Sequence, residues 1–118
     1  MSSAYVVITA LAVAANGASG IVGPFARERT APAMRRVGVP ESWVLFPIST
    51  LKLAGALGLL LGLLGVPLVG LAAAVGLCMF WACAVHTHLL ARDRSPQLGL
   101  ALGFLALALA SLALTLAG

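Results

Sequence analysis

Charge is scarce in this sequence. Asp, Glu, Lys and Arg make up 8% of its 118 residues, whereas a soluble domain has about 25%. Hydrophobic residues make up 62%, and there are 13 glycines besides, so too few polar side chains remain to cover a surface that faces water. This composition excludes a soluble globular enzyme, and it is also too apolar for a disordered chain.

Cysteine pairs and the short motifs of soluble enzymes are lacking too. The two cysteines, Cys78 and Cys83, are five residues apart on one predicted helix, too far for an unstrained disulfide, so a disulfide scaffold is excluded. The sequence has no CxxC motif, glycine-rich phosphate loop or Ser-His-Asp order that would indicate a redox, nucleotide or hydrolase site. The class that remains is a small integral membrane protein.

Four long apolar stretches fill nearly the whole chain. Each has about the 20 residues that a helix needs to cross a bilayer, and charge and proline collect only between them. Apolar runs that do not alternate with polar residues argue against transmembrane strands. We therefore predict one all-α transmembrane domain over 1–118, an integral membrane four-helix bundle. Its spans are about 4–22, 43–65, 68–91 and 97–117, with a basic loop at 23–42.

The two basic links predict the topology. The loop at 23–42 holds four arginines and a predicted short helix from Thr30 to Val37, and the link after the third stretch holds Arg92 and Arg94. Basic residues favour the cytoplasmic face, so we predict both links inside and both termini outside, in a bacterial inner (cytoplasmic) membrane. The net charge of +4 is then a topology signal, and no nucleic-acid partner is expected.

Small residues recur at helical spacing in three of the stretches. Helices in lipid associate by close backbone approach at such residues. We expect these rows to pack the bundle, with self-association into a homo-oligomer through an unused row as the alternative. The rows are Ala54, Gly58 and Gly62 with the adjacent Gly55, then Ala72 and Gly76, then Gly99 and Gly103.

Few polar side chains lie deep within the spans, and each is costly there, so they mark candidate functional residues. At about 1.5 Å per residue, Asn16 lies about 9 Å from the predicted cytoplasmic end of its span, and Lys52 about 15 Å. His86 and His88 lie about 9 and 6 Å from Arg92 by the same measure. We predict that Asn16, Lys52 and a histidine converge in the cytoplasmic half. The two histidines point about 200° apart, so no metal site is expected.

Three segments resemble the DoxX-like family of small four-helix membrane proteins. They are 37–43 (VGVPESW), 51–59 (LKLAGALGL) and 87–93 (THLLARD). The resemblance extends over almost the full length and implies that the family's second-span lysine corresponds to Lys52 and its third-span histidine to His88. The charged pair that follows corresponds to Arg92 and Asp93. The resemblance also implies a link to quinone-associated oxidoreductase systems.

The first functional hypothesis is a site for a lipophilic, quinone-like ligand within a membrane oxidoreductase system. Lys52 and His88 are its candidate catalytic or hydrogen-bonding residues. No covalently bound cofactor is expected, and a partner redox protein would carry the electrons. The further candidate ligand contacts are the polar residues Asn16, Ser49 and Arg92 and the aromatic residues Trp43, Phe46 and Trp81.

Two alternatives stay open. One is an isolated intramembrane acid/base enzyme, of isomerase or epoxide-opening type, in which Lys52 and His88 act with His86, Glu41 or Asp93 on an apolar substrate. The other is a non-catalytic subunit that binds a partner membrane protein through its glycine rows, so that the polar layer only fixes helix register. Membrane lipids are expected partners in every case.

Overall fold

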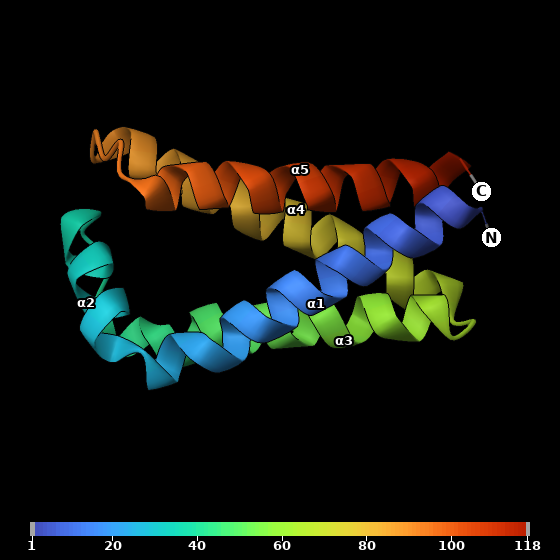
Figure 1. Ribbon diagram of the computed structural model, residues 1–118, viewed down its shortest axis with the longest axis horizontal. Helices are drawn as coiled ribbons and strands as arrows, with labels where there is room; N and C mark the ends of the chain where they lie inside the picture. The colour runs from blue at the N-terminus through green and yellow to red at the C-terminus, as the bar shows by residue number, and fades with distance from the viewer. Residues whose placement is uncertain (1, 118) are drawn as a thin grey trace.

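The computed structural model describes residues 2–117, except for the side chains of Arg27 and Arg29, as an all-helical protein (Figure 1). The prediction of an all-α chain is confirmed. The helices are α1 (Ser3–Phe25), α2 (Arg27–Arg36), α3 (Thr50–Leu63), α4 (Pro67–Leu90) and α5 (Pro96–Ala117). Among the described residues, four segments are long and apolar enough to cross a membrane, namely α1, Glu41–Leu63, α4 and α5.

The four long helices form a closed ring. Along this ring α1 packs on α3, α3 on α4, α4 on α5 and α5 on α1. Both termini and the α3–α4 turn lie at one end of the molecule, and α2 lies across the opposite end beside the α4–α5 link (Figure 1). We call this the α2 end. The termini therefore share an end, while the side of the membrane they face stays a prediction from the basic links.

Glycines let α3 and α4 approach each other closely. A Cβ added at Gly62 would lie 2.7 Å from the Cα of Gly70, and one at Gly58 would lie 2.6 Å from the Cβ of Ala73. The three glycines of the predicted row, Gly55, Gly58 and Gly62, are buried inside the bundle, whereas Ala54 of the same row is exposed. α4 meets this row with Gly70 and Ala73 rather than with the predicted row of Ala72 and Gly76. No atom lies within 4 Å of an added Cβ at Gly76, Gly99 or Gly103.

The second membrane segment begins irregularly, and the prediction of one helix over 43–65 is wrong for its first turns. A 3₁₀ turn over Glu41–Val44 leads into a wide turn over Leu45–Ser49, where Phe46 is extended (φ −135°, ψ 130°). Pro47 causes this break, because a proline disfavours the helical conformation in the residue before it. The regular helix α3 begins only at Thr50.

Helix α2 begins at Arg27, three residues before the predicted start at Thr30. The Thr30 hydroxyl does not cap the helix. It lies inside the helix and donates to the carbonyl oxygens of Gly23 (3.2 Å) and Ala26 (3.0 Å). These bonds hold α2 against the last turn of α1, from which it crosses the end of the bundle.

Candidate functional site

A buried amide joins α1 to α4. Asn16 is fully buried, and its Nδ2 donates to the carbonyl oxygen of Ala12 one turn earlier, at 2.9 Å. Its Oδ1 accepts a hydrogen bond from Nε1 of Trp81, also at 2.9 Å. A buried indole N–H needs such a partner, so Asn16 fixes the position of the Trp81 ring inside the bundle.

Aromatic rings from α4 and α5 hold Trp81 on its other sides. The Phe104 ring stacks on it with centroids 4.3 Å apart and planes 13° apart. Phe80 meets it edge to face at 5.0 Å. These contacts leave the indole 6% exposed. Trp81 is therefore a rigid aromatic platform rather than a mobile side chain.

Lys52 of α3 brings its ammonium group to this platform. Its Nζ donates to Oγ of Ser19 at 2.9 Å and lies 5.1 Å from the centroid of the Trp81 ring. We call Asn16, Ser19, Lys52 and Trp81 the inner layer. An ammonium carries three donors and no acceptor, and Ser19 is its only hydrogen-bond acceptor in the described part of the chain.

None of the three acidic side chains compensates the charge of Lys52. Glu41 pairs with Arg35, and Asp93 pairs with Arg36 and His88. Glu28 is exposed on α2. A charged group inside a membrane span usually pairs with an opposite charge or lines a functional site. In the inner layer, therefore, no carboxylate of the described side chains accompanies the Lys52 ammonium.

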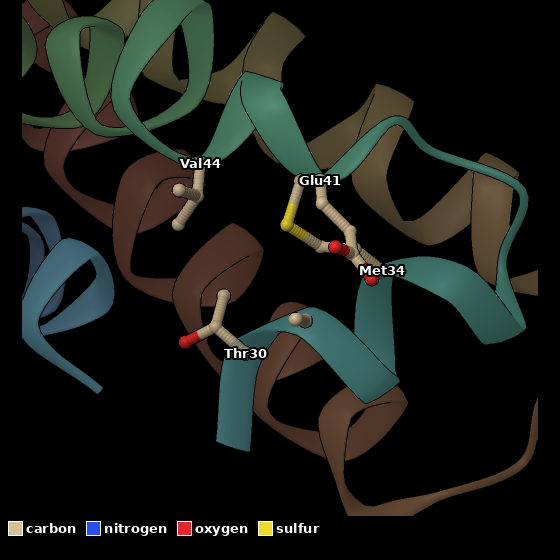
Figure 2. Close-up of a pocket in the computed structure, with 5 residues that line it drawn as sticks. Thr30, Met34, Glu41 and Val44 are labelled. Carbon is tan, nitrogen blue, oxygen red and sulfur yellow. The ribbon is translucent and has the colours of Figure 1, made fainter. Parts of the chain in front are cut away.

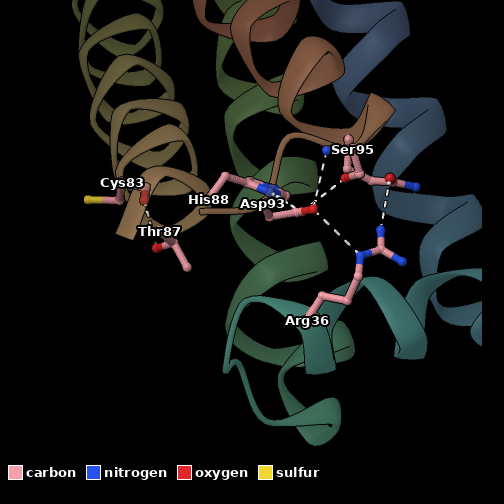
Figure 3. Close-up of polar contacts among 7 residues, drawn as sticks. Arg36, Cys83, Thr87, His88, Asp93 and Ser95 are labelled. Atoms are coloured by element: carbon pink, nitrogen blue, oxygen red, sulfur yellow. Dashed lines mark hydrogen bonds and ion pairs between the residues drawn. The ribbon is translucent and has the colours of Figure 1, made fainter. Parts of the chain in front are cut away.

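A second polar group lies at the α2 end. Nδ1 of His88 is 2.8 Å from Oδ2 of Asp93, and the backbone N–H and hydroxyl of Ser95 donate to the same carboxylate at 3.2 and 2.9 Å (Figure 3). Arg36 reaches over from α2, with its Nε 3.6 Å from Oδ1 of Asp93 and its Nη2 donating to Oε1 of Gln97 at 3.1 Å. We call Arg36, His88, Asp93, Ser95 and Gln97 the end cluster.

The Asp93 carboxylate is ionised in this setting. Burial acts to raise its pKa, but the hydrogen bonds from His88 and Ser95 and the charge of Arg36 outweigh burial and hold the pKa below its ordinary value. An ionised carboxylate only accepts hydrogen bonds. Nδ1 of His88 therefore donates the hydrogen bond of 2.8 Å to Oδ2 of Asp93.

The turn after α4 brings Asp93 back to His88. The backbone N–H of Asp93 bonds to the carbonyl of His88 at 2.9 Å, which places Arg92 in the left-handed region with φ 55°. Two other helix ends use the same turn with glycine, at Gly38 and Gly65. A side chain in this conformation costs about 1–2 kcal/mol, so Arg92 occupies a position where glycine is less strained.

Two cavities lie near the α2 end. The larger, of about 330 Å³, is lined by His88, Leu89, Arg92, Asp93 and Arg94. The smaller, of about 100 Å³, lies between α2 and the 3₁₀ turn and is lined by Thr30, Ala31, Met34, Glu41 and Val44 (Figure 2). Neither is lined by the residues of the inner layer.

The comparison with known proteins gives a family. The model of the DoxX-like family matches residues 7–111, which include the inner layer and the end cluster. The chain belongs to the DoxX-like family. No curated protein and no solved structure matched the chain.

The structure of this DoxX-like protein divides the predicted site residues into two groups. Asn16, Lys52 and Trp81 lie together in the inner layer, whereas His88 lies with Asp93 in the end cluster. The expected convergence of His88 with Lys52 is not seen, because His88 follows Trp81 by seven residues, about 10 Å along the helix, and is bonded to Asp93 there. His86 is exposed.

Other predicted contacts lie outside both groups. Trp43 and Phe46 were expected as aromatic walls but are 47% and 68% exposed, because the break before Pro47 takes them off the regular helix. Phe80 and Phe104 surround Trp81 in their place. The remaining residues are Ser49, which is buried close to Gly23, and Glu41, which pairs with Arg35.

Sequence reasoning missed several polar partners. Thr9 and Ser111 join α1 to α5 through a buried hydroxyl pair at 2.7 Å. Thr115 bonds within its own helix, where its hydroxyl donates to the carbonyl of Ser111 at 2.7 Å. The Thr87 hydroxyl likewise donates to the backbone carbonyl oxygen of Cys83 at 2.8 Å (Figure 3). Ser19 carried a usable signal, because it follows Asn16 by three residues and so shares its face.

Proposed function

We propose that this DoxX-like protein binds a lipophilic carbonyl compound of the quinone type at Lys52, as part of a membrane oxidoreductase system. The observation that carries the proposal is the ammonium of Lys52, which lies in a membrane segment with Ser19 and the Trp81 ring as partners and without a carboxylate. A carbonyl oxygen is an acceptor that such a donor can bind strongly, because hydrogen bonds to a charged group exceed neutral ones.

The surroundings of Lys52 suit an apolar ligand that arrives from the bilayer. The neighbouring side chains on α3, Leu51 and Leu53, are 47% and 38% exposed on the outer surface of the bundle. The buried Trp81 ring, held by Asn16, lies under the Lys52 ammonium and fixes its position. A few fixed polar groups within a mostly apolar, aromatic wall are typical of small-molecule sites.

The electrons in this proposal come from a partner redox protein in the same membrane, and the bound compound exchanges them with that partner.

The bacterial inner membrane and external termini are part of the proposal, and they rest on the basic residues gathered at the α2 end. A reporter that is active only in the cytosol, fused after Gly118, should be inactive. Its activity would reverse the topology.

Ligand content tests the binding site. The protein is purified with its native lipids, and quinone is extracted and quantified per chain for the wild type and for Lys52→Met, which keeps an unbranched apolar side chain. Thr115→Val is the matched control, because that hydroxyl bonds only within its own helix. We expect stoichiometric quinone in the wild type and the control, and its loss in Lys52→Met. Quinone retained by a folded Lys52→Met protein would contradict the proposal.

The His88–Asp93 pair favours a second candidate, a proton-transfer enzyme of isomerase or epoxide-opening type. The pair lines the cavity of about 330 Å³, and a histidine held by a carboxylate is a general base of common type. Turnover of an apolar epoxide by the isolated protein, abolished in a folded His88→Gln variant, would support it. If neither Lys52→Met nor His88→Gln alters any activity in cells, a non-catalytic interaction subunit is the remaining function.

A further inference from the structure

The larger cavity at the α2 end has a positively charged lining. Arg92 and Arg94 line it together with His88, Leu89 and one carboxylate, that of Asp93. The cavity is separate from the inner layer, so whatever binds here is not the compound proposed at Lys52. Its volume of about 330 Å³ lies within the range of small-molecule sites.

The carboxylate in the lining is already compensated. Asp93 has a side chain only 8% exposed, with Arg36 3.6 Å away and hydrogen bonds from Ser95 and His88. Arg92 and Arg94, in contrast, form no ion pair with any described residue. The cavity therefore keeps an excess of positive charge that an anion can neutralise.

The position of the cavity along the bundle points to a lipid. The apolar run of α4 ends at Leu90, and the last two leucines, Leu89 and Leu90, are 60% and 73% exposed. Arginines directly beyond the end of a membrane helix lie at the level of lipid headgroups, where they attract anionic ones. An anion at this level with an apolar tail would lie against the exposed leucines.

The backbone conformation of Arg92 also points to a binding role. Arg92 occupies a left-handed turn position with φ 55°, whereas the equivalent turns after α2 and α3 use Gly38 and Gly65. Glycine takes this conformation without strain. An arginine in this place sacrifices backbone stability for a cationic side chain, as residues in binding sites commonly do.

We propose that this cavity binds the phosphate of an anionic lipid headgroup, with Arg92 and Arg94 on the phosphate oxygens and Leu89 against the acyl chain. Arginine suits this contact because its guanidinium donates two parallel hydrogen bonds to phosphate. The site gives the α4–α5 link a fixed lipid at the α2 end of the bundle.

Native mass spectrometry of the protein released from nanodiscs tests the site. Discs contain equal amounts of phosphatidylglycerol and phosphatidylcholine, and the retained lipid is counted for the wild type and for the double variant Arg92→Gly, Arg94→Gln. The glycine relieves the turn, so folding is preserved. Arg35→Gln, which removes one positive charge where the double variant removes two, is the control for surface charge, because Arg35 pairs with Glu41 away from the cavity.

We expect selective retention of phosphatidylglycerol by the wild type and the control, weakened roughly fivefold for each cavity arginine removed. Equal retention of the two lipids, or the same loss per removed charge in Arg35→Gln as in the double variant, would overturn the proposal, because general surface charge then explains the binding. A further arm adds millimolar inorganic phosphate. Displacement of phosphatidylglycerol by inorganic phosphate would assign the cavity to a soluble phosphate and overturn the lipid assignment.

Discussion

The contact between Gly62 and Gly70 gives a quantitative test of the packing between α3 and α4. In Gly62→Ala the new Cβ would lie 2.7 Å from the Cα of Gly70, and ordinary contact begins at 3.4 Å. The obstructing atom belongs to the backbone, so the helices must separate by at least the difference, 0.7 Å. Overpacking of this kind costs about 1–3 kcal/mol. Alanine returns about 0.5–1 kcal/mol through its helix propensity, so we expect a net loss of up to about 2.5 kcal/mol.

The assay is reversible unfolding in mixed micelles by titration with a denaturing detergent, followed by circular dichroism. Gly76→Ala is the matched control, because no atom lies within 4 Å of its added Cβ and the helix propensity acts alone. The free energy of unfolding should fall in Gly62→Ala and stay equal or rise in Gly76→Ala. Equal effects of the two substitutions would refute the reasoning, since the close approach of α3 and α4 would then not exist in the membrane protein.

Three further predictions concern the polar groups. Trp81→Phe leaves Oδ1 of Asn16 without its donor and should lower the free energy of unfolding by about 0.6–1.7 kcal/mol. In a double-mutant cycle, the Trp81→Phe, Asn16→Leu protein should recover part of that loss. Arg36→Gln removes the link from α2 to Asp93, so amide hydrogen exchange of α2 should become faster at neutral pH while that of α4 stays unchanged. Folding lowers the pKa of Asp93. The stabilisation that this carboxylate gives is therefore present above the ordinary Asp pKa of about 4 and is lost as the pH falls through the lower, folded value. Acid should accordingly weaken the hydrogen-exchange protection of α2 in the wild type, and this loss should be absent in Asp93→Asn.

Much of the architecture could be predicted from the length of the apolar stretches. A run of about 20 apolar residues has few structures open to it in a membrane, and glycines at Gly58 and Gly62 identified the close face of α3. Its irregular beginning was not foreseen. The predicted span 43–65 includes Pro47 in its first turns, where a missing N–H is harmless, but the effect of this proline on the preceding Phe46 decided the conformation.

The candidate site was only partly predictable. Depth along each helix can be estimated from residue number, and it places Asn16 and Lys52 in the same half of the bundle, where both meet Trp81. The rotation of each helix about its axis cannot be estimated in this way, so His88 was expected to meet Lys52 rather than Asp93. The contact of Arg36 depends on the path of α2 across the bundle, which no pattern in its sequence encodes.

Quenching of Trp81 fluorescence by a short-chain quinone tests the central claim, that Lys52 holds a carbonyl ligand beside this ring. The chain has 2 tryptophans, so Trp43→Phe leaves Trp81 as the only one, with the Lys52 ammonium 5.1 Å from its ring centroid. We predict saturable quenching in the Trp43→Phe protein and a linear, non-saturating response once Lys52→Met is added. Saturation with the same midpoint in both proteins would contradict the account.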